Sequence, residues 1–145
     1  MGGAMARNKG ARGERAVVKI LQDIVTEEYS KVGLRPVELQ RNLMQAYKTN
    51  GGEGNHDLVG VSWMALEVKH HETLHCNDWW DQTVRQAGEN KEPILFYRKN
   101  NSAWRVRMYG FLLSRTFRVK TDCDIDLESF LVYFRMRLQE VIQGS

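Results

Sequence analysis

The sequence predicts a single α/β domain with a mixed central β-sheet, helices packed against that sheet, and a further helix near the C-terminus. One observation is the helical spacing of apolar residues between about residues 10 and 29. Another is a stretch at residues 63–70 whose apolar and polar side chains alternate. The third is the order of the expected elements, which is helix, three strands, helix, hairpin and helix. Strands and helices in this order favour a sheet covered by helices.

The first predicted helix runs from about Gly10 to Tyr29 and has an apolar face. Glu14 lies three residues before Val17 and seven before Leu21, so it belongs to that same face. A carboxylate on a buried stripe is costly unless another group pairs with it. We therefore take Glu14 as a candidate site residue.

Three strands are expected next, at residues 37–47, 56–61 and 63–70. Asn50, Gly51, Gly52 and Gly54 indicate a loop between the first two. The third strand alternates: its even-numbered residues point to one side and its odd-numbered residues to the other. The even set is Met64, Leu66 and Val68, and the odd set is Ala65, Glu67 and Lys69.

The second half of the chain continues with a helix at residues 77–88, for which Asn77 or Asp78 is the expected cap. A strand at residues 94–98 then turns back through residues 104–109 to make a hairpin. A last amphipathic helix is expected after a cap at Asp124 or Asp126. Its face carries Phe130, Leu131, Phe134, Leu138 and Val141.

The length of 145 residues suits one domain, so we expect residues 1–145 to form a single unit. Within it we expect residues 1–8 to be a flexible arm and residues 111–145 to be a C-terminal extension. Cys76 and Cys123 lie far apart, which favours reduced thiols and a cytoplasmic setting. We expect no membrane partner, since no apolar run approaches the roughly 18 residues that a span needs.

Charge is unevenly distributed, although the net charge is only +3. Basic residues cluster near the start of the chain and again between residues 98 and 120, whereas acidic residues gather at residues 122–128. Such segregation favours a polyanionic partner, and a solvated surface explains it almost as well.

Asp57, Glu67 and Lys69 are the residues most suited to chemistry. Nine residues separate Asp57 from Glu67, which is enough for one strand to turn and its neighbour to return beside it. Glu67 and Lys69 leave the same face of one strand. Two carboxylates with a backbone carbonyl, here that of Val68, suit Mg²⁺, and we expect Mn²⁺ to substitute for it.

Phosphodiester hydrolysis needs an activated water and neutralisation of the developing charge. In this interpretation Asp57 and Glu67 hold the metal, with Val68 as a third ligand. Lys69 positions the water or stabilises the developing charge. Glu14 completes the set as a direct ligand, through water, or at a second metal.

These residues resemble a known family. Asp57, Glu67 and Lys69 match the D-x(n)-E-x-K signature of the PD-(D/E)xK nucleases. Residues 9–15 look like the Lys-Gly…Glu start of archaeal-type and phage-type Holliday junction resolvases. Residues 41–45, the glycine loop before Asp57, and residues 79–87 are similar to phage-encoded members. The likeness extends from about residue 9 to about residue 109, and it departs at His56, where the signature has proline.

The resemblance implies a restriction-endonuclease-like core and a Mg²⁺-dependent, structure-selective DNA endonuclease. It also implies a homodimer with one active site per subunit, which cuts opposed strands of a four-way junction. Binding would be nearly independent of sequence, through phosphates and branched shape. The candidate DNA contacts are Arg7, Lys9 and Arg12 on a mobile arm, Arg41 and Gln45 on one strand, and Gln82 on the following helix.

Two other functions remain open at this point. One is another PD-(D/E)xK nuclease of the repair or restriction type, although the compact chain has no room for a target-recognition domain. The other is a DNA-binding module that keeps the fold without catalysis, which the presence of all four catalytic-type residues argues against.

Overall fold

The computed structural model describes residues 3–43 and 56–144, with side chains from residue 8 onward. The predicted α/β fold is confirmed: a mixed six-stranded sheet is flanked by helices, with a helix at the C-terminal end. The strands lie in the sheet in the order in which they occur in the chain. The elements are α1 (Gly3–Lys31), β1 (Gln40–Arg41), β2 (Leu58–Val59), β3 (Met64–His71), α2 (Cys76–Ala87), β4 (Glu92–Lys99), β5 (Arg105–Leu113), β6 (Arg118–Asp126) and α3 (Leu127–Gly144).

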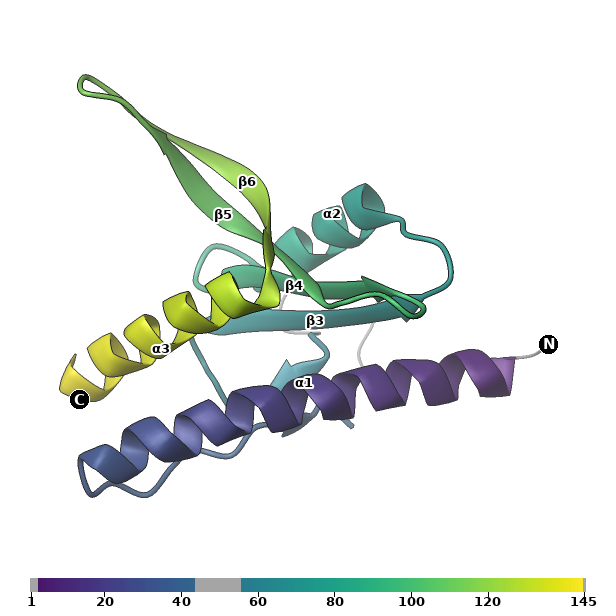
Figure 1. Ribbon diagram of the computed structural model, residues 1–145, viewed down its shortest axis with the longest axis horizontal. Coiled ribbons are helices and arrows are strands. Elements are labelled where there is room, and N and C mark those ends of the chain that lie inside the picture. The colour runs from purple at the N-terminus through teal and green to yellow at the C-terminus, as the bar shows by residue number, and fades with distance from the viewer. Residues whose placement is uncertain (1–2, 44–55, 145) are drawn as a thin grey trace.

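The sheet has one parallel pair, β3 with β4, and α2 makes the crossover between these two strands. Its other neighbouring strands pair antiparallel. Helices α1 and α3 lie on one side of β3 and β4, and α2 lies on the other side (Figure 1). Because helices cover both faces, the first five residues of β3, including Glu67, are buried.

The main core lies between the sheet and the two helices α1 and α3. The expected faces are confirmed: Val17 and Leu21 of α1 and Phe130 and Phe134 of α3 are buried in it. The even-numbered residues of β3 point into this core as predicted. They are Met64, Leu66 and Val68.

A second, smaller core lies under α2. Trp79 and Trp80 of that helix pack against Leu95 and Tyr97 of β4. Leu95 is the register partner of Glu67 in β3, and Tyr97 is the partner of Lys69. Adjacent partners in a sheet point to the same face, so Glu67 and Lys69 lie on the α2 side.

Two glycines allow close approaches that position β2 and β3. A Cβ added at Gly13 would lie 3.2 Å from the Cβ of His70, so α1 approaches β3 closely at this point. Gly60 follows β2 with φ of +124°, a conformation that L side chains rarely adopt. Its added Cβ would lie 2.3 Å from the carbonyl oxygen of Glu38, so only glycine fits against that segment.

Residues 3–8, which the sequence analysis expected to be part of a flexible arm, form the first turns of α1. Ala4, Met5, Ala6 and Arg7 are good helix formers and continue the helix toward the N-terminus. Lys9 and Arg12 therefore belong to a helix that packs against β3. They are not on a mobile arm.

The first two strands are shorter than predicted. Of residues 37–43, only Gln40–Arg41 pairs with a neighbour, and of residues 56–61 only Leu58–Val59 forms a strand. The sharp turn at Gly60 ends β2 and so limits the ladder. Residues 44–47 of the predicted strand lie outside the described residues.

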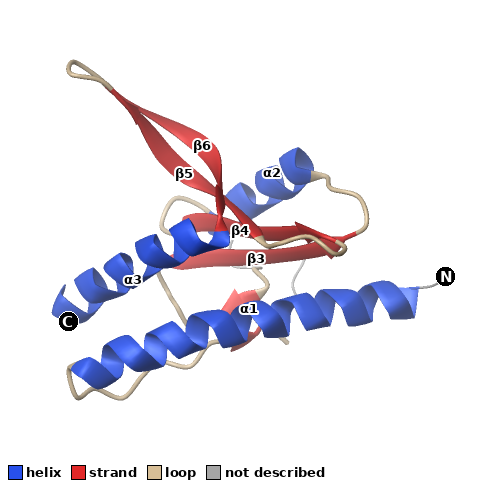
Figure 2. Cartoon of the chain, in the orientation of Figure 1, coloured by secondary structure: helices blue, strands red, loops and turns tan. Residues whose placement is uncertain are grey.

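The predicted hairpin of β4 and β5 is present, but β5 is longer than predicted, and the strand that follows it, β6, was missed. β5 continues past Tyr109 to Leu113, and β6 pairs with it along its whole length. Residues 110–120 are mostly exposed, since the end of the β5–β6 hairpin extends beyond the body of the domain (Figure 2). The sequence of β6 does alternate, with Val119, Thr121, Cys123 and Ile125 between charged residues, and Cys123 and Ile125 pack against the core.

Two of the expected caps have clear outcomes. Asp126 caps α3, because its Oδ1 accepts a hydrogen bond of 3.3 Å from the backbone N–H of Ser129. The predicted cap of α2 at Asn77 or Asp78 is wrong, since the N-cap is His75, without a side-chain capping bond. In the described part of the chain, no helix is both long and apolar enough to cross a membrane.

Candidate active site

Asp57 and Glu67 meet where β2 and β3 pair. The backbone N–H of Asp57 donates to Glu67 Oε1 at 3.1 Å and to the carbonyl oxygen of Leu66 at 3.0 Å. The backbone N–H of Val68 in turn donates to Asp57 Oδ2 at 2.8 Å. Each carboxylate is thus held by an amide of the neighbouring segment. The structure brings together the two acidic residues that the sequence analysis put at the centre of the site.

Both carboxylates are removed from water. Glu67 is 1% exposed and Asp57 is 7% exposed. Burial raises the pKa of Glu67 well above its usual range, and the negative charge of Asp57 beside it raises that pKa further. Two buried acids placed side by side concentrate negative charge, which favours a cation between them.

Asn42 fixes the segment that carries Asp57. Its backbone N–H donates to the carbonyl oxygen of Asp57 at 2.8 Å, and its side-chain Nδ2 donates to the carbonyl oxygen of His56 at 2.9 Å. The residue lies directly after β1, so it ties the sheet edge to the site. The sequence analysis placed Asn42 in a block resembling phage-encoded members but gave it no role. A lone asparagine in a sequence does not show which backbone it will bind.

Lys69 leaves β3 on the same face as Glu67 and is partly exposed. Its positive charge partly opposes the rise in the pKa of Glu67, and it does the same for Glu14. Lys69 is therefore electrostatically coupled to both acids. An ammonium in this position can hold a water molecule or a phosphate oxygen.

Glu14 reaches the site from α1, next to the close approach at Gly13. It is 15% exposed, and its Oε1 accepts a hydrogen bond of 2.7 Å from Nε of Arg41 in β1. Burial raises the pKa of Glu14, the Arg41 hydrogen bond opposes that rise, and the charge of Asp57 adds to it. The apolar spacing that singled out Glu14 thus located an acid that interacts with the Asp57 carboxylate.

These acids do not form a ready-made cage. Over residues 3–43 and 56–144, no three or more His, Cys, Asp or Glu side chains are grouped so as to hold a metal ion. Small divalent cations need only one or two protein carboxylates, together with carbonyl oxygens and water. Asp57 and Glu67 supply that donor set, and the buried negative charge between them suits such an ion.

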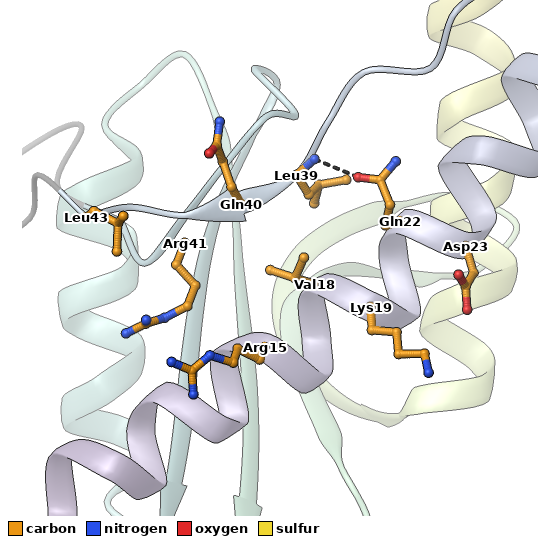
Figure 3. A pocket seen from close by; sticks show the side chains of 9 residues that line it. All are labelled: Arg15, Val18, Lys19, Gln22, Asp23, Leu39, Gln40, Arg41 and Leu43. Atoms are coloured by element: carbon orange, nitrogen blue, oxygen red, sulfur yellow. Dashed lines mark hydrogen bonds between the residues drawn. The ribbon is translucent and has the colours of Figure 1, made fainter.

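A pocket of about 480 Å³ opens between α1 and β1 beside this site. Figure 3 shows the side chains of Arg15 and Arg41 directed into the same space, with Lys19 further along α1. Gln22 joins the two elements, since its Oε1 accepts a hydrogen bond of 2.7 Å from the backbone N–H of Leu39 (Figure 3). Arg41 therefore lies at the border between the acidic site and a pocket whose lining combines apolar side chains with Arg15, Lys19 and Asp23.

The other residues expected to contact DNA lie in several parts of the chain. Lys9 and Arg12 lie on α1 near His70, and Gln82 lies half-buried on α2. Arg7 is part of α1, and its side chain is outside the described part of the structure. Gln45 lies outside the described residues.

The fold and the site together are those of an α/β protein with a buried pair of acids where β2 and β3 meet. The chain belongs to the family described as "Phage putative PDDEXK endonuclease", whose family model matches residues 5–128. This confirms the resemblance to the PD-(D/E)xK nucleases, and the class of protein is an endonuclease. None of the curated proteins matches the chain significantly.

Among solved structures, the chain is similar to Hjc of Archaeoglobus fulgidus, a Holliday junction resolvase from an archaeal hyperthermophile. The identity is 18%, the match covers 80% of this chain and 98% of that chain, and the TM-score is 0.40.

Proposed function

We propose that this endonuclease is a Mg²⁺-dependent, structure-selective DNA nuclease that cuts opposed strands of four-way junctions as a homodimer. The observation that carries the catalytic part is the buried pair of Asp57 and Glu67, with Lys69 on the same strand face as Glu67. The preference for junctions is supported by the resemblance of residues 9–15 to the start of junction resolvases.

Asp57 and Glu67 would hold the metal, with the carbonyl oxygen of Val68 as a further ligand. Hard oxygen donors in this number are those that Mg²⁺ prefers, and Mn²⁺ accepts the same set. When bound, such an ion supplies positive charge beside the phosphate and lowers the pKa of water.

The chain's own residues then have separate tasks. Lys69 orients the attacking water or donates to a phosphate oxygen on which negative charge develops. Glu14 adds a third acid at the edge of the site, as a direct ligand or through water. Arg41, which holds Glu14 by a bond of 2.7 Å, can release it to contact a phosphate of the substrate.

DNA binding is proposed to depend mainly on phosphate contacts. Arg7, Lys9 and Arg12 on α1 and Arg41 on β1 supply positive charge, while Gln45 and Gln82 supply amide donors. Contacts of this kind carry little sequence information, so recognition of branched shape fits them better than recognition of a base sequence.

A homodimer follows from the symmetry of the proposed substrate. A four-way junction has approximate two-fold symmetry, and two identical active sites related by a dyad can cut two opposed strands. We also propose that the enzyme works in the cytoplasm of its host cell, where its thiols Cys76 and Cys123 stay reduced.

The test is to incubate the purified protein with a synthetic four-way junction and with a linear duplex, each with Mg²⁺ or with EDTA. Paired, symmetric nicks in the junction alone, dependent on Mg²⁺, are the expected result. Equal cutting of both DNAs would replace the proposal with a general repair-type or restriction-type nuclease. Tight binding without any cut, under Mg²⁺ and under Mn²⁺, would instead favour a non-catalytic DNA-binding module.

A further inference from the structure

A basic pocket, separate from the one in Figure 3, opens where α1 passes the C-terminal ends of β3 and β4. Its volume is about 460 Å³. Neither the acidic site nor the pocket beside Arg41 includes it. We call it the Arg98 pocket; the residues used below are Lys9, Arg12, His70, Arg98, Asn100 and Trp104.

The charges of the Arg98 pocket are of one sign. Lys9 and Arg12 lie three residues apart on one face of α1, and Arg98 comes from β4. No aspartate or glutamate lines the pocket. Bringing like charges together costs free energy, so a pocket of this kind favours an anion.

These three cations also differ from other arginines of the domain. Arg107 pairs with Asp124, and Arg137 pairs with Glu92. Within the described part of the chain, Lys9, Arg12 and Arg98 form no ion pair with any carboxylate. Their charge is therefore available for a ligand.

Arg98 is held in place before any ligand binds. Its guanidinium lies over the ring of Trp104, 5.5 Å from the ring centre, and Trp104 is itself buried. The Nε of Arg98 and the Oδ1 of Asn100 are buried without a hydrogen-bond partner among the described residues. A buried polar atom without a partner is costly, and a polar ligand in the pocket offers one.

The Arg98 pocket lies close to the acidic site along the same elements. His70 directly follows Lys69 in β3 but points to the α1 side of the sheet, whereas Glu67 points to the α2 side; three residues of about 3.3 Å each separate Glu67 from His70 by roughly 10 Å along the strand. On α1, Gly13 of the pocket directly precedes Glu14. A DNA strand at the acidic site can therefore reach this pocket past the ends of β3 and β4 with a phosphate a few nucleotides away.

We propose that the Arg98 pocket binds one internal backbone phosphate of the cleaved strand, within a few nucleotides of the phosphate that is cut. The inference rests on the proposed function, because it takes DNA as the substrate. It assigns to Arg98, which no argument above uses, a positioning contact with the substrate. The fork of an arginine suits a phosphate, and the lysine and the second arginine add charge.

The first test measures binding in EDTA to the DNA that the wild-type protein cuts, with Arg98→Gln and Lys9→Gln as variants. Lys99→Gln is the matched control, because Lys99 is exposed, adjacent in sequence and outside the pocket. Each pocket variant is expected to bind about tenfold more weakly, and the slope of log K against log salt to fall by about 0.9. The control is expected to keep both values, and thermal unfolding checks that each variant is folded.

The second test replaces single internal phosphates of the cleaved strand by neutral methylphosphonates, one position at a time. For the wild-type protein, one position within a few nucleotides of the cut is expected to weaken binding about tenfold. Arg98→Gln is expected to lose sensitivity at that position and to keep it elsewhere, which a general effect of charge does not produce.

The outcomes separate this inference from the proposed function. A wild-type protein that neither binds nor cuts DNA overturns both. Two results overturn the Arg98 pocket alone, provided that the wild-type protein cuts DNA. One is equal binding by Arg98→Gln and Lys99→Gln. The other is that the loss of affinity caused by Arg98→Gln and the loss caused by the methylphosphonate simply add. Sensitivity only to a phosphate at a strand end also overturns it, because the proposed ligand is internal.

Discussion

Two glutamates of this domain are almost equally buried, yet their surroundings are opposite. Glu28, near the end of α1, is 3% exposed and Glu67 is 1% exposed. Glu28 accepts hydrogen bonds from Lys31 at 2.9 Å, from Gln139 at 2.9 Å and from Arg135. These donors lower the pKa of Glu28 to about 2, whereas burial and the charge of Asp57 raise the pKa of Glu67.

Glu28 has a structural role, whereas Glu67 has the surroundings of the catalytic acid that we propose. The chain neutralises Glu28 with its own cations and thereby ties α1 to α3. Among the described residues, Glu67 accepts a hydrogen bond from the backbone N–H of Asp57 and has a lysine further along the strand, while the Asp57 carboxylate beside it raises its pKa. Perturbed acids of this second kind concentrate at functional sites.

The largest contrast is expected in catalysis. Glu67→Gln should reduce cleavage by on the order of 10³-fold or more, because a metal ligand that stabilises transition-state charge is lost. DNA binding in EDTA should stay equal, since the raised pKa keeps Glu67 protonated in the metal-free protein and the amide replaces a neutral acid. Single-turnover cleavage of the junction and a binding titration measure the two effects.

Glu28→Gln is the matched control, because it makes the same chemical change at a buried acid far along α1. Its folded fraction should cut at close to the wild-type rate. If both variants lost cleavage equally, or if Glu67→Gln cut like the wild type, the assignment of Glu67 to the site would be wrong.

In stability, Glu28→Gln should have a larger effect than Glu67→Gln, and both effects should be smaller than the effect of Glu67→Gln on cleavage. Glu28→Gln should lower the free energy of unfolding by about 2 kcal/mol, because hydrogen bonds from charged partners are lost. Glu67→Gln in the metal-free protein should be neutral or stabilise by up to about 1 kcal/mol, because the amide oxygen can still accept from Asp57 N–H. Urea unfolding in EDTA at neutral pH measures both, and equal destabilisation by the two variants would contradict the contrast.

The two acids should also give opposite pH dependences of stability. The contribution of Glu28 is present above its unfolded pKa near 4.5 and is lost as the pH falls toward its folded value of about 2. The raised pKa of Glu67 means that the metal-free folded state holds a proton longer than the unfolded state does. Its contribution is therefore complete below 4.5 and is lost as the pH rises through the folded value.

Urea unfolding in EDTA from about pH 3 to about pH 9, for wild type and each variant, isolates these terms. The difference between wild type and Glu28→Gln should shrink on acidification. As the pH rises, the free energy of unfolding of the wild type should fall relative to that of Glu67→Gln, by at most about 1.4 kcal/mol per pH unit. A difference for Glu67→Gln that does not change with pH would contradict the raised pKa.

The smallest effect concerns the helix that carries both Glu14 and Glu28. Gly13→Ala places a Cβ 3.2 Å from His70 Cβ and 3.3 Å from Trp104, so α1 must move by a few tenths of an ångström at Glu14. Gly10→Ala meets nothing within 4 Å and should stabilise by about 0.5–1 kcal/mol through helix propensity. Gly13→Ala should lack that gain and cut about threefold more slowly, as steady-state kinetics and thermal unfolding can show.

Much of this arrangement follows from periodicity. The strand around Glu67 was predictable because its odd and even residues differ in polarity, and Glu14 because a carboxylate interrupts an apolar helical face. The pair of Asp57 and Glu67 was predictable because their spacing suits two adjacent antiparallel strands. These features depend on neighbours in sequence.

What escaped prediction depends on neighbours in space. The bond from Arg41 to Glu14 spans 27 residues, and its sequence shows only one arginine among many. Arg98 joins Lys9 and Arg12 only because α1 crosses the ends of β3 and β4. β6 is an exception, because residues 118–126 do alternate in polarity and the sequence analysis took their acidic members only as a charge cluster.

Asp57 and Glu67 are proposed to bind a divalent cation, and calorimetric titration with Mg²⁺ tests this binding most directly. Titrations at neutral pH in two buffers of different ionisation enthalpy report the protons released on binding. We expect about one proton to leave per ion bound, because the cation replaces the proton favoured by the raised pKa of Glu67, and no release in Glu67→Gln. Absence of Mg²⁺ binding, or binding that Glu67→Gln leaves unchanged, would contradict the account.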